Sequence, residues 1–287
     1  MSLCKYYLEV AEVDHKVRLG GKRPTLKNIL ESNREYFDKP PPKITSVGSD
    51  AKTVKGKKVD VVTAIVYLPQ DTMISKKTNC AFAHLAGCSE DCLIGAGRLG
   101  MRHATLAIIR RGLFFMYKRE QFDLQLQAEI MQLSLRHGDK LAVRLNGTSD
   151  IDFSYMIEKF PEVQFYDYTK ILNRVSKNKL ENYDLTYSFS PYSKKSLEHG
   201  YQAIKDKRKV ALAFNTKGSK GDTLQIPDTL FSGKKLVSFD DTDARFLDKK
   251  GSIGFLTRKG SSVKERQREN QIAESFFVTE SNIKFLK

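Results

Sequence analysis

The sequence predicts an α/β protein built on a mainly parallel sheet. Apolar segments of strand length alternate with segments of helical periodicity between residues 58 and 260. This alternation is typical of parallel strands joined by right-handed helical crossovers. The first apolar segment, 59–69, is a continuous β-branched run of the kind that is buried on both faces of a sheet. Because no glycine-rich phosphate motif follows it, we favour a full or partial (β/α) barrel of the TIM type over a doubly wound sheet.

Two polar regions flank the predicted domain at 58–260. Residues 1–57 are expected to form an irregular N-terminal extension that packs on the core, with a short helix within 16–33 and a rigid connector at 36–44. Residues 261–287 are expected to form a C-terminal tail with a helix at 263–274.

A long helical stretch follows the first strand, from about residue 100 to His137, with Gly112 as a candidate break. Six further strands and the helices between them complete the alternating pattern. The predicted strands are 141–146, 163–168, 183–189, 209–214, 236–240 and 252–258, and the helices that connect the first four of these are 153–160, 169–177 and 193–204.

The bulk composition excludes several classes of protein. Hydrophobic residues make up 40% of the 287 residues, which is enough to bury a sizeable core. The longest apolar run, 61–68, is far too short to span a bilayer, and the first ten residues lack the apolar stretch of a secretory signal. We therefore expect a cytoplasmic protein without membrane contact. Neither a Ser–His–Asp hydrolase motif nor a P-loop is present in the sequence.

The formal net charge of +15 favours an anionic partner, with nucleic acid or a nucleotide as the first candidate. The basic residues are scattered along the chain, and aromatic residues do not alternate with them as they do in a base-stacking surface. A solvated basic surface with no nucleic-acid partner therefore stays an equal alternative. The charge says nothing about oligomeric state.

Three of the four cysteines, Cys80, Cys88 and Cys92, directly follow the first predicted strand with the spacing C-x7-C-x3-C. Such a cluster in a chain without a secretory signal indicates metal or redox chemistry rather than a disulfide framework. Three thiolates on one loop hold three irons of a [4Fe–4S] cluster and leave the fourth iron open, which is the interpretation we favour. Zinc requires a fourth ligand, which His84 would supply because it continues the four-residue spacing. Buried thiols without a metal are the third alternative.

Polar residues follow the other predicted strands, and the carboxyl ends of parallel strands are where sites collect in such sheets. We expect these residues to converge with the cysteines on one rim. Proton transfer and orientation of a substrate are assigned to Asp150, Asp167, Lys170 and Asp243, and cofactor contacts to Asn146, Thr148 and Arg98. The guanidinium of Arg98 would offset the negative charge of a thiolate-ligated cluster.

Four segments resemble the signatures of the phage "gene product eighty-eight" family. They are CAFAHLAGCSEDCLIGAGR at 80–98, VRLNGTSDI at 143–151, FPEVQFYDYTK at 160–170 and FDDTDARFLDKKGSIGFLTRKG at 239–260. The resemblance implies a phage or prophage origin, and hence location in a host cytoplasm. It also implies that the three cysteines act together, but it implies no particular reaction.

A cysteine loop directly after the first strand of a (β/α) barrel is also similar to the architecture of the radical S-adenosylmethionine enzymes. In that comparison the open iron would bind S-adenosylmethionine, and Asn146, Thr148 and Asp150 would face the cofactor. The cysteine spacing of this chain differs from the usual motif of those enzymes, which has three and then two intervening residues.

Two functional hypotheses follow from these observations. The first is a phage-encoded iron–sulfur protein, possessing an open iron and acting as a redox or radical-type enzyme. The second is a basic nucleic-acid-binding phage protein with a structural zinc site formed by three cysteines and His84. The sequence leaves open whether the protein is an enzyme.

Overall fold

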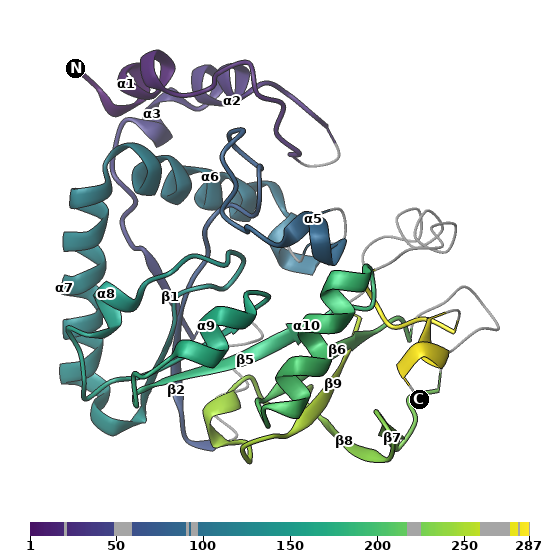
Figure 1. Ribbon diagram of the computed structural model, residues 1–287. Helices are drawn as coiled ribbons and strands as arrows, with labels where there is room; N and C mark the ends of the chain where they lie inside the picture. Colours follow the sequence, from purple (N-terminus) through teal and green to yellow (C-terminus); the bar gives the residue numbers. More distant parts are fainter. Residues whose placement is uncertain are drawn as a thin grey trace.

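A computed structural model of the chain has the mixed α/β architecture that the sequence predicts (Figure 1). The structure describes residues 1–19, 22–48, 59–89, 92, 97–216, 225–258, 276–280 and 282–286. Its centre is a sheet of nine strands in the order β1-β2-β3-β4-β5-β6-β9-β8-β7. The strands are β1 (Thr45–Val47), β2 (Val62–Val66), β3 (Leu141–Arg144), β4 (Gln164–Thr169), β5 (Tyr183–Phe189), β6 (Val210–Phe214), β7 (Thr229–Leu230), β8 (Lys234–Ser238) and β9 (Ile253–Thr257).

The sheet is mostly parallel, as expected. Each strand from β2 to β6 pairs in parallel with the next one along the chain, and β9 pairs in parallel with both β6 and β8. The two edges are antiparallel, because β1 pairs with β2 and β7 pairs with β8 in that sense. All seven predicted strands are present, whereas β1 lies in a region that we expected to be irregular.

The prediction of a full barrel is wrong, because the sheet is open. The edge strands are β1 and β7, which have three and two residues, and in the described residues they do not pair with each other. A closed TIM barrel needs a continuous ring of parallel strands, and antiparallel edges interrupt that ring. The apolar run of β2 is present in both architectures, so it does not distinguish a closed ring from an open sheet.

The helices connecting the strands cover one face of this sheet. They are α6 (Arg102–Tyr117), α7 (Arg119–His137), α8 (Ser154–Ile157), α9 (Leu172–Lys177) and α10 (Lys194–Lys205), with short 3₁₀ turns η4 (Gly138–Lys140) and η5 (Arg245–Leu247). Figure 1 shows α9 and α10 lying next to one another in front of the strands, with α8 beside α7. Alternate residues of the strands, such as Val143, Phe165 and Leu212, bury their side chains in the main core. The core thus lies on the face that the crossovers cover.

The long predicted helix is two helices, and the break between them differs from the predicted one. Lys118, with φ of −135°, separates α6 from α7. Gly112 lies within α6 instead, where a Cβ atom would lie 2.1 Å from Cγ of Pro69. The glycine therefore allows α6 to approach the chain at the end of β2, and it does not end the helix.

The N-terminal region has more regular structure than predicted. It contains α1 (Leu3–Val10), α2 (Leu26–Ser32) and α3 (Arg34–Phe37), which share a hydrophobic cluster with α6. The helix expected within 16–33 is shorter, because the backbone of 16–25 forms antiparallel bridges before α2 begins. The predicted helix at 263–274 lies outside the described residues, while a short turn η6 (Ile283–Leu286) lies near the end of the chain.

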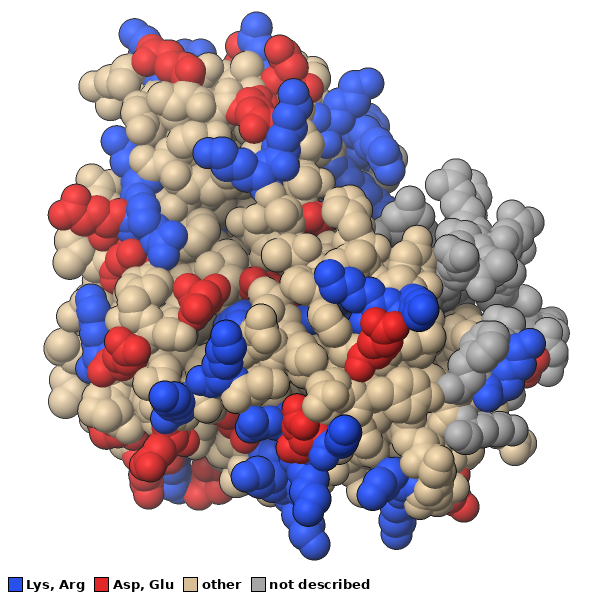
Figure 2. Space-filling model, viewed as in Figure 1, with Lys and Arg blue, Asp and Glu red and all other residues tan. Residues whose placement is uncertain are grey.

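In the part of the chain that the structure describes, no helix combines the length and apolarity that crossing a membrane requires. The visible surface carries many charged side chains, and Figure 2 shows one group of Lys and Arg at the middle of its lower margin and another toward the upper right.

Candidate functional site

The cysteine segment leaves the carboxyl end of β2 and folds over the ends of the neighbouring strands. It contains the short helix α5 (Ala83–Ala86), which ends at Gly87 with φ of 65°. A Cβ atom at Gly87 would lie 2.2 Å from the ring of Tyr192, so both the conformation and the close approach require glycine. Ser190 and Ser193 donate hydrogen bonds to the carbonyl groups of Ala86 and Leu85. The end of β5 thus fixes the segment between Cys80 and Cys88.

Cys80 and Cys88 have partly buried thiols close enough to influence one another. Burial, with smaller contributions from the negative charges of Asp150 and of a Cys88 thiolate, raises the pKa of the Cys80 thiol to about 12, although the backbone N–H of Asp71 opposes the rise. That N–H donates to Cys80 Sγ over 3.5 Å. Burial also raises the pKa of Cys88, against the ammonium group of Lys170. Both thiols are therefore protonated near neutral pH, and a metal would have to displace their protons.

Asp71 joins the two halves of the cysteine segment. Its carboxylate accepts hydrogen bonds from Thr78 Oγ1 at 2.6 Å and from Ser89 Oγ at 2.9 Å. Asp71 has a φ of 34°, a strained value for a residue other than glycine. His84 Nε2 lies 4.0 Å from the same carboxylate, and the His84 side chain is 80% exposed. Position 71 directly follows the first predicted strand, so the rule used for the other strand ends would have found it.

Asp150 and Lys170 lie at the same rim, as predicted. The backbone N–H of Asp150 donates to the carbonyl group of Asn79, next to Cys80. The Asp150 carboxylate accepts the backbone N–H of Lys170 and pairs with Arg174. The Lys170 ammonium donates to Ser188 Oγ at 2.7 Å and lies 4.2 Å from the centre of the Phe276 ring. These contacts bring the ends of β3, β4 and β5 together beside the cysteines.

Asn146 and Thr148 hold the loop after β3 in place. The Asn146 amide donates to Asp167 and to the carbonyl group of Ile151, and its oxygen accepts two further hydrogen bonds. Thr148 donates to the carbonyl group of Leu68, and its own carbonyl group lies 4.0 Å from Cys80 Sγ. The polar groups of both side chains thus have partners within the protein, which explains their position but leaves their cofactor role a prediction.

Asp167 and Asp243 belong to a buried polar cluster centred on Arg144. Arg144 pairs with Asp243 at 2.9 Å, lies 3.9 Å from Asp167 and lies over the ring of Tyr168. Burial raises the pKa of Asp167 to about 6, although Arg144 and Arg174 oppose the shift. Arg144 and Tyr166 occupy neighbouring positions of β3 and β4 and alternate with residues of the main core, so they lie on the sheet face opposite to the crossover helices. Asp167 instead shares the face of the core residue Phe165, where it accepts a hydrogen bond from Tyr183 Oη. Sequence reasoning missed Arg144, although a charge within the apolar run LAVRL is a usable signal.

The remaining two predicted residues are less fully described. Cys92 is a half-buried cysteine. Arg98 belongs by its backbone to the turn η3 (Gly97–Gly100), and its side chain lies outside the described residues. Among the described residues, no group of three or more His, Cys, Asp and Glu side chains is arranged to hold a metal ion.

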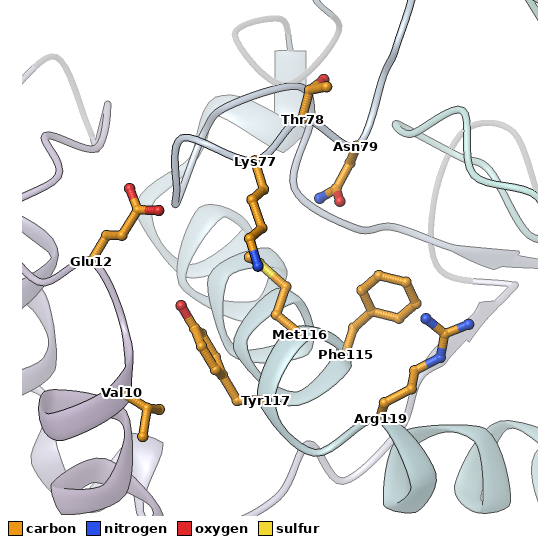
Figure 3. A pocket seen from close by; sticks show the side chains of 9 residues that line it. All are labelled: Val10, Glu12, Lys77, Thr78, Asn79, Phe115, Met116, Tyr117 and Arg119. Atoms are coloured by element: carbon orange, nitrogen blue, oxygen red, sulfur yellow. The ribbon is translucent and has the colours of Figure 1, made fainter.

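A pocket of about 430 Å³ borders the cysteine segment on its N-terminal side (Figure 3). One wall is the segment Lys77–Asn79, which immediately precedes Cys80, and the opposite wall is the junction of α6 and α7. Figure 3 shows the Lys77 side chain pointing toward the middle of the pocket. Arg119 on the far side pairs with Asp123 and donates to Tyr155. The pocket has a mixed lining without a distinct set of ligand-binding groups.

The fold defines the class of protein as mixed α/β, with an open and mostly parallel sheet. The chain belongs to the Gene product 88 family of phage proteins, whose family model matches residues 43–274. The resemblance found in the sequence is thereby confirmed. No curated protein and no solved structure matches the chain.

Proposed function

We propose that this phage protein binds a [4Fe–4S] cluster through Cys80, Cys88 and Cys92, on a sheet that represents a partial (β/α) barrel. The observation that carries the proposal is that Ala83 of α5 is hydrogen-bonded to both Cys80 and Cys88, which holds the two cysteines at the rim where Asp150 and Lys170 also lie. Thiolates are the usual ligands of iron–sulfur clusters. The unbroken order of β2 to β6, each beside its sequence neighbour, supports the partial barrel.

The surroundings of the two thiols fit a cluster ligated by thiolates. Both thiols are partly buried, and low solvent exposure protects a cluster. The Lys170 ammonium lies close enough to Cys88 to favour its thiolate, and a positive charge there would offset the negative charge of the bound group. A [4Fe–4S] cluster supplies one-electron transfer, and an iron without a protein ligand supplies a coordination site.

His84 favours the cluster over zinc. A tetrahedral zinc site made of three cysteines needs His84 as its fourth ligand. The His84 side chain is 80% exposed and its Nε2 is nearest to Asp71, so it does not pack among the thiols. Three cysteines without a fourth ligand suit a cluster with one open iron. On this proposal Asp150 and Lys170 orient the group that binds there, in a redox or radical-type reaction.

S-adenosylmethionine is the first small molecule to test at the open iron. The hydrogen bonds of Asn146 and Thr148 are made within the loop, so direct contacts from their side chains are not part of the proposal. Its binding would instead depend on the iron and on Asp150 and Lys170. A change in the electron paramagnetic resonance spectrum of the reduced cluster on addition of S-adenosylmethionine would support this ligand, and an unchanged spectrum would exclude it.

Anaerobic reconstitution followed by iron, sulfide and zinc analysis tests the proposal. We expect about four irons and four sulfides per chain, with a broad absorbance band near roughly 400 nm. The variant C80A/C88A/C92A should lose both, whereas Cys4→Ala should keep them, because Cys4 lies in the N-terminal cluster and donates to the carbonyl group of Leu30. A colourless protein with about one zinc would overturn the proposal in favour of a structural zinc site in a nucleic-acid-binding protein.

A further inference from the structure

A row of lysines lies at the end of the sheet where the parallel strands begin, opposite to the end that carries the cysteines. The proposed cluster does not explain these lysines. The four strands β5, β6, β9 and β8 are consecutive neighbours and run in parallel, so their amino ends lie at one edge. Each of these ends brings two exposed lysines. They are Lys177 and Lys179 before β5, Lys205 and Lys207 before β6, Lys249 and Lys250 before β9, and Lys234 and Lys235 at the start of β8.

Contacts between the loops show that these lysines form one surface, which we call the lysine edge. Arg208 Nη2 donates to the carbonyl group of Ser176 at 3.2 Å, which joins the loop before β6 to the end of α9. Gly251 lies against Lys207, because a Cβ atom on Gly251 would lie 3.5 Å from the Lys207 carbonyl oxygen. Leu236 is in register with Ile253, so the start of β8 lies beside the same loop. Figure 2 shows Lys and Arg gathered along this lower margin, below α10.

The positive charge of the lysine edge is not neutralised locally. None of its eight lysines forms an ion pair with another described residue. The two nearest acidic residues that point inward, Asp184 and Asp248, pair with Lys209 and Arg245 instead. Three exposed acidic residues, Glu181, Asp206 and Asp228, are interspersed with the eight lysines. The surface therefore has a strong positive excess.

The other half of the same sheet edge is different. Lys140, before β3, pairs with Asp60 and has Asp139 beside it. Lys159, before β4, donates to Gln127 and is preceded by Glu158. Among the described residues before β3 and β4, basic residues therefore have acidic neighbours or partners, whereas the eight lysines before β5, β6, β9 and β8 form no ion pair with a described residue.

We propose that the lysine edge binds the phosphate backbone of duplex nucleic acid without reading its sequence. Neighbouring strands are about 4.8 Å apart, so four strands set the eight lysines along roughly 15 Å. Duplex DNA carries about one negative charge per 1.7 Å of its axis, which matches a row of this density. The partly exposed aromatic residue in the described loops, Phe246, packs its ring against Tyr166, so the loops offer no row of rings on which unpaired bases would stack, and a duplex fits better than a single strand.

This surface and the cysteines lie at opposite ends of the same strands. Binding at the lysine edge therefore does not depend on a cluster, and protein without iron is suitable for the test. If the cluster proposal fails, the proposed nucleic-acid surface is still tested independently by the measurement of DNA binding. Both proposals together would place a redox centre on a protein that is held against nucleic acid.

Fluorescence anisotropy with a labelled DNA duplex of mixed sequence tests the proposal across a series of salt concentrations. If six to eight lysines contact phosphates, log affinity should fall against log salt with a slope of about −5 to −7. In the variant K205E/K207E/K249E/K250E we expect affinity at low salt to fall about a hundredfold or more, with a shallower slope. The same four positions changed to Gln should give a smaller loss in the same direction.

The matched control is K5E/K16E/K22E/K27E, which changes the net charge equally within the N-terminal region. These four lysines are also exposed, and we expect the control to keep its affinity within about threefold at the same salt. An equal loss of affinity for the duplex in both variants would show that only net charge matters and would overturn the proposal. A loss of affinity confined to the control would indicate that the binding surface lies in the N-terminal region instead. Binding to vesicles of phosphatidylserine and phosphatidylcholine, without binding to the duplex, would also overturn the proposal.

Discussion

Burial raises the pKa of the Cys88 thiol, and the neighbouring Lys170 ammonium opposes this rise while it donates to Ser188 Oγ at 2.7 Å. The lysine follows β4, the serine belongs to β5, and the cysteine lies on the segment that follows β2. One ammonium group thus connects three parts of the rim. A fixed positive charge beside a thiolate ligand stabilises the more negative, reduced form of a bound cluster.

Lys170→Met should therefore make the reduction potential of the reconstituted cluster more negative. The reason is the loss of a positive charge near Cys88, with the apolar stem of the side chain largely retained. The potential is measured by redox titration with electron paramagnetic resonance detection. Lys170→Arg should restore most of the wild-type value, and Lys43→Met, which removes an exposed lysine elsewhere, should not change it. Equal reduction potentials in Lys170→Met and wild type would show that the charge of Lys170 does not act on the cluster.

Gly87→Ala should destabilise the protein by more than the cost of a positive φ alone. A Cβ atom at Gly87 would lie 2.2 Å from Tyr192, so α5 or the end of β5 must move. The matched control is Gly48→Ala, since Gly48 has φ of 68° and no atom within 4 Å of the added Cβ. We expect about 1 kcal/mol for the control and about 2 to 4 kcal/mol for Gly87→Ala in denaturant unfolding. Similar losses at both positions would mean that the contact with Tyr192 is not tight.

Because Arg144 and Asp243 form an ion pair, we expect their substitutions to have strongly non-additive effects on the free energy of unfolding. Arg144→Leu leaves the Asp243 carboxylate beside a buried cluster without its 2.9 Å partner, and we expect a loss of about 3 to 5 kcal/mol. The double variant R144L/D243L should lose less than this single variant, because the Asp243 charge is removed together with its partner and Asp167 still has Arg174 nearby. Urea unfolding of the two single variants and the double variant measures the coupling. Additive losses would show that the pair makes no net contribution.

Asp167 predicts a pH dependence of stability. Burial raises the pKa of Asp167 from 3.8 to about 6 in the folded protein, so the folded state binds more protons than the unfolded state between these values. The stability associated with protonated Asp167 is therefore fully present below about pH 4 and is lost as the pH rises through 6, by about 3 kcal/mol. Asp167→Asn, which cannot ionise, should lack this part of the pH profile. An identical pH profile in wild type and variant would contradict the shift.

Much of the fold was predictable from the sequence because strands that are buried in a parallel sheet are continuous apolar runs. Segments such as VTAIV in β2 and VALAF in β6 have that pattern, and the structure confirms them. Whether the sheet closes depends on its edges. The strands β1 and β7 have three and two residues, too short to give a reliable pattern, and they determine that the sheet is open.

The site was predictable to the extent that it depends on strand ends. Asp150 and Lys170 were expected at the rim with the cysteines, and the hydrogen bonds of the structure connect them there. The roles of Asp71 and Arg144 depend on long-range contacts, with Ser89 and Asp243 respectively. Spacing in the sequence does not reveal such contacts. The helical four-residue spacing of the cysteines was misleading, because α5 ends at Gly87 before it reaches Cys88.

The most direct test of the central claim is a Mössbauer spectrum of the protein reconstituted with isotopically enriched iron. A [4Fe–4S] cluster held by Cys80, Cys88 and Cys92 has one iron without a cysteine ligand, so we predict two iron environments in a ratio of about three to one. A ligand that binds the open iron should change only the minor component. Four equivalent irons, or a protein that retains no iron, would contradict the account.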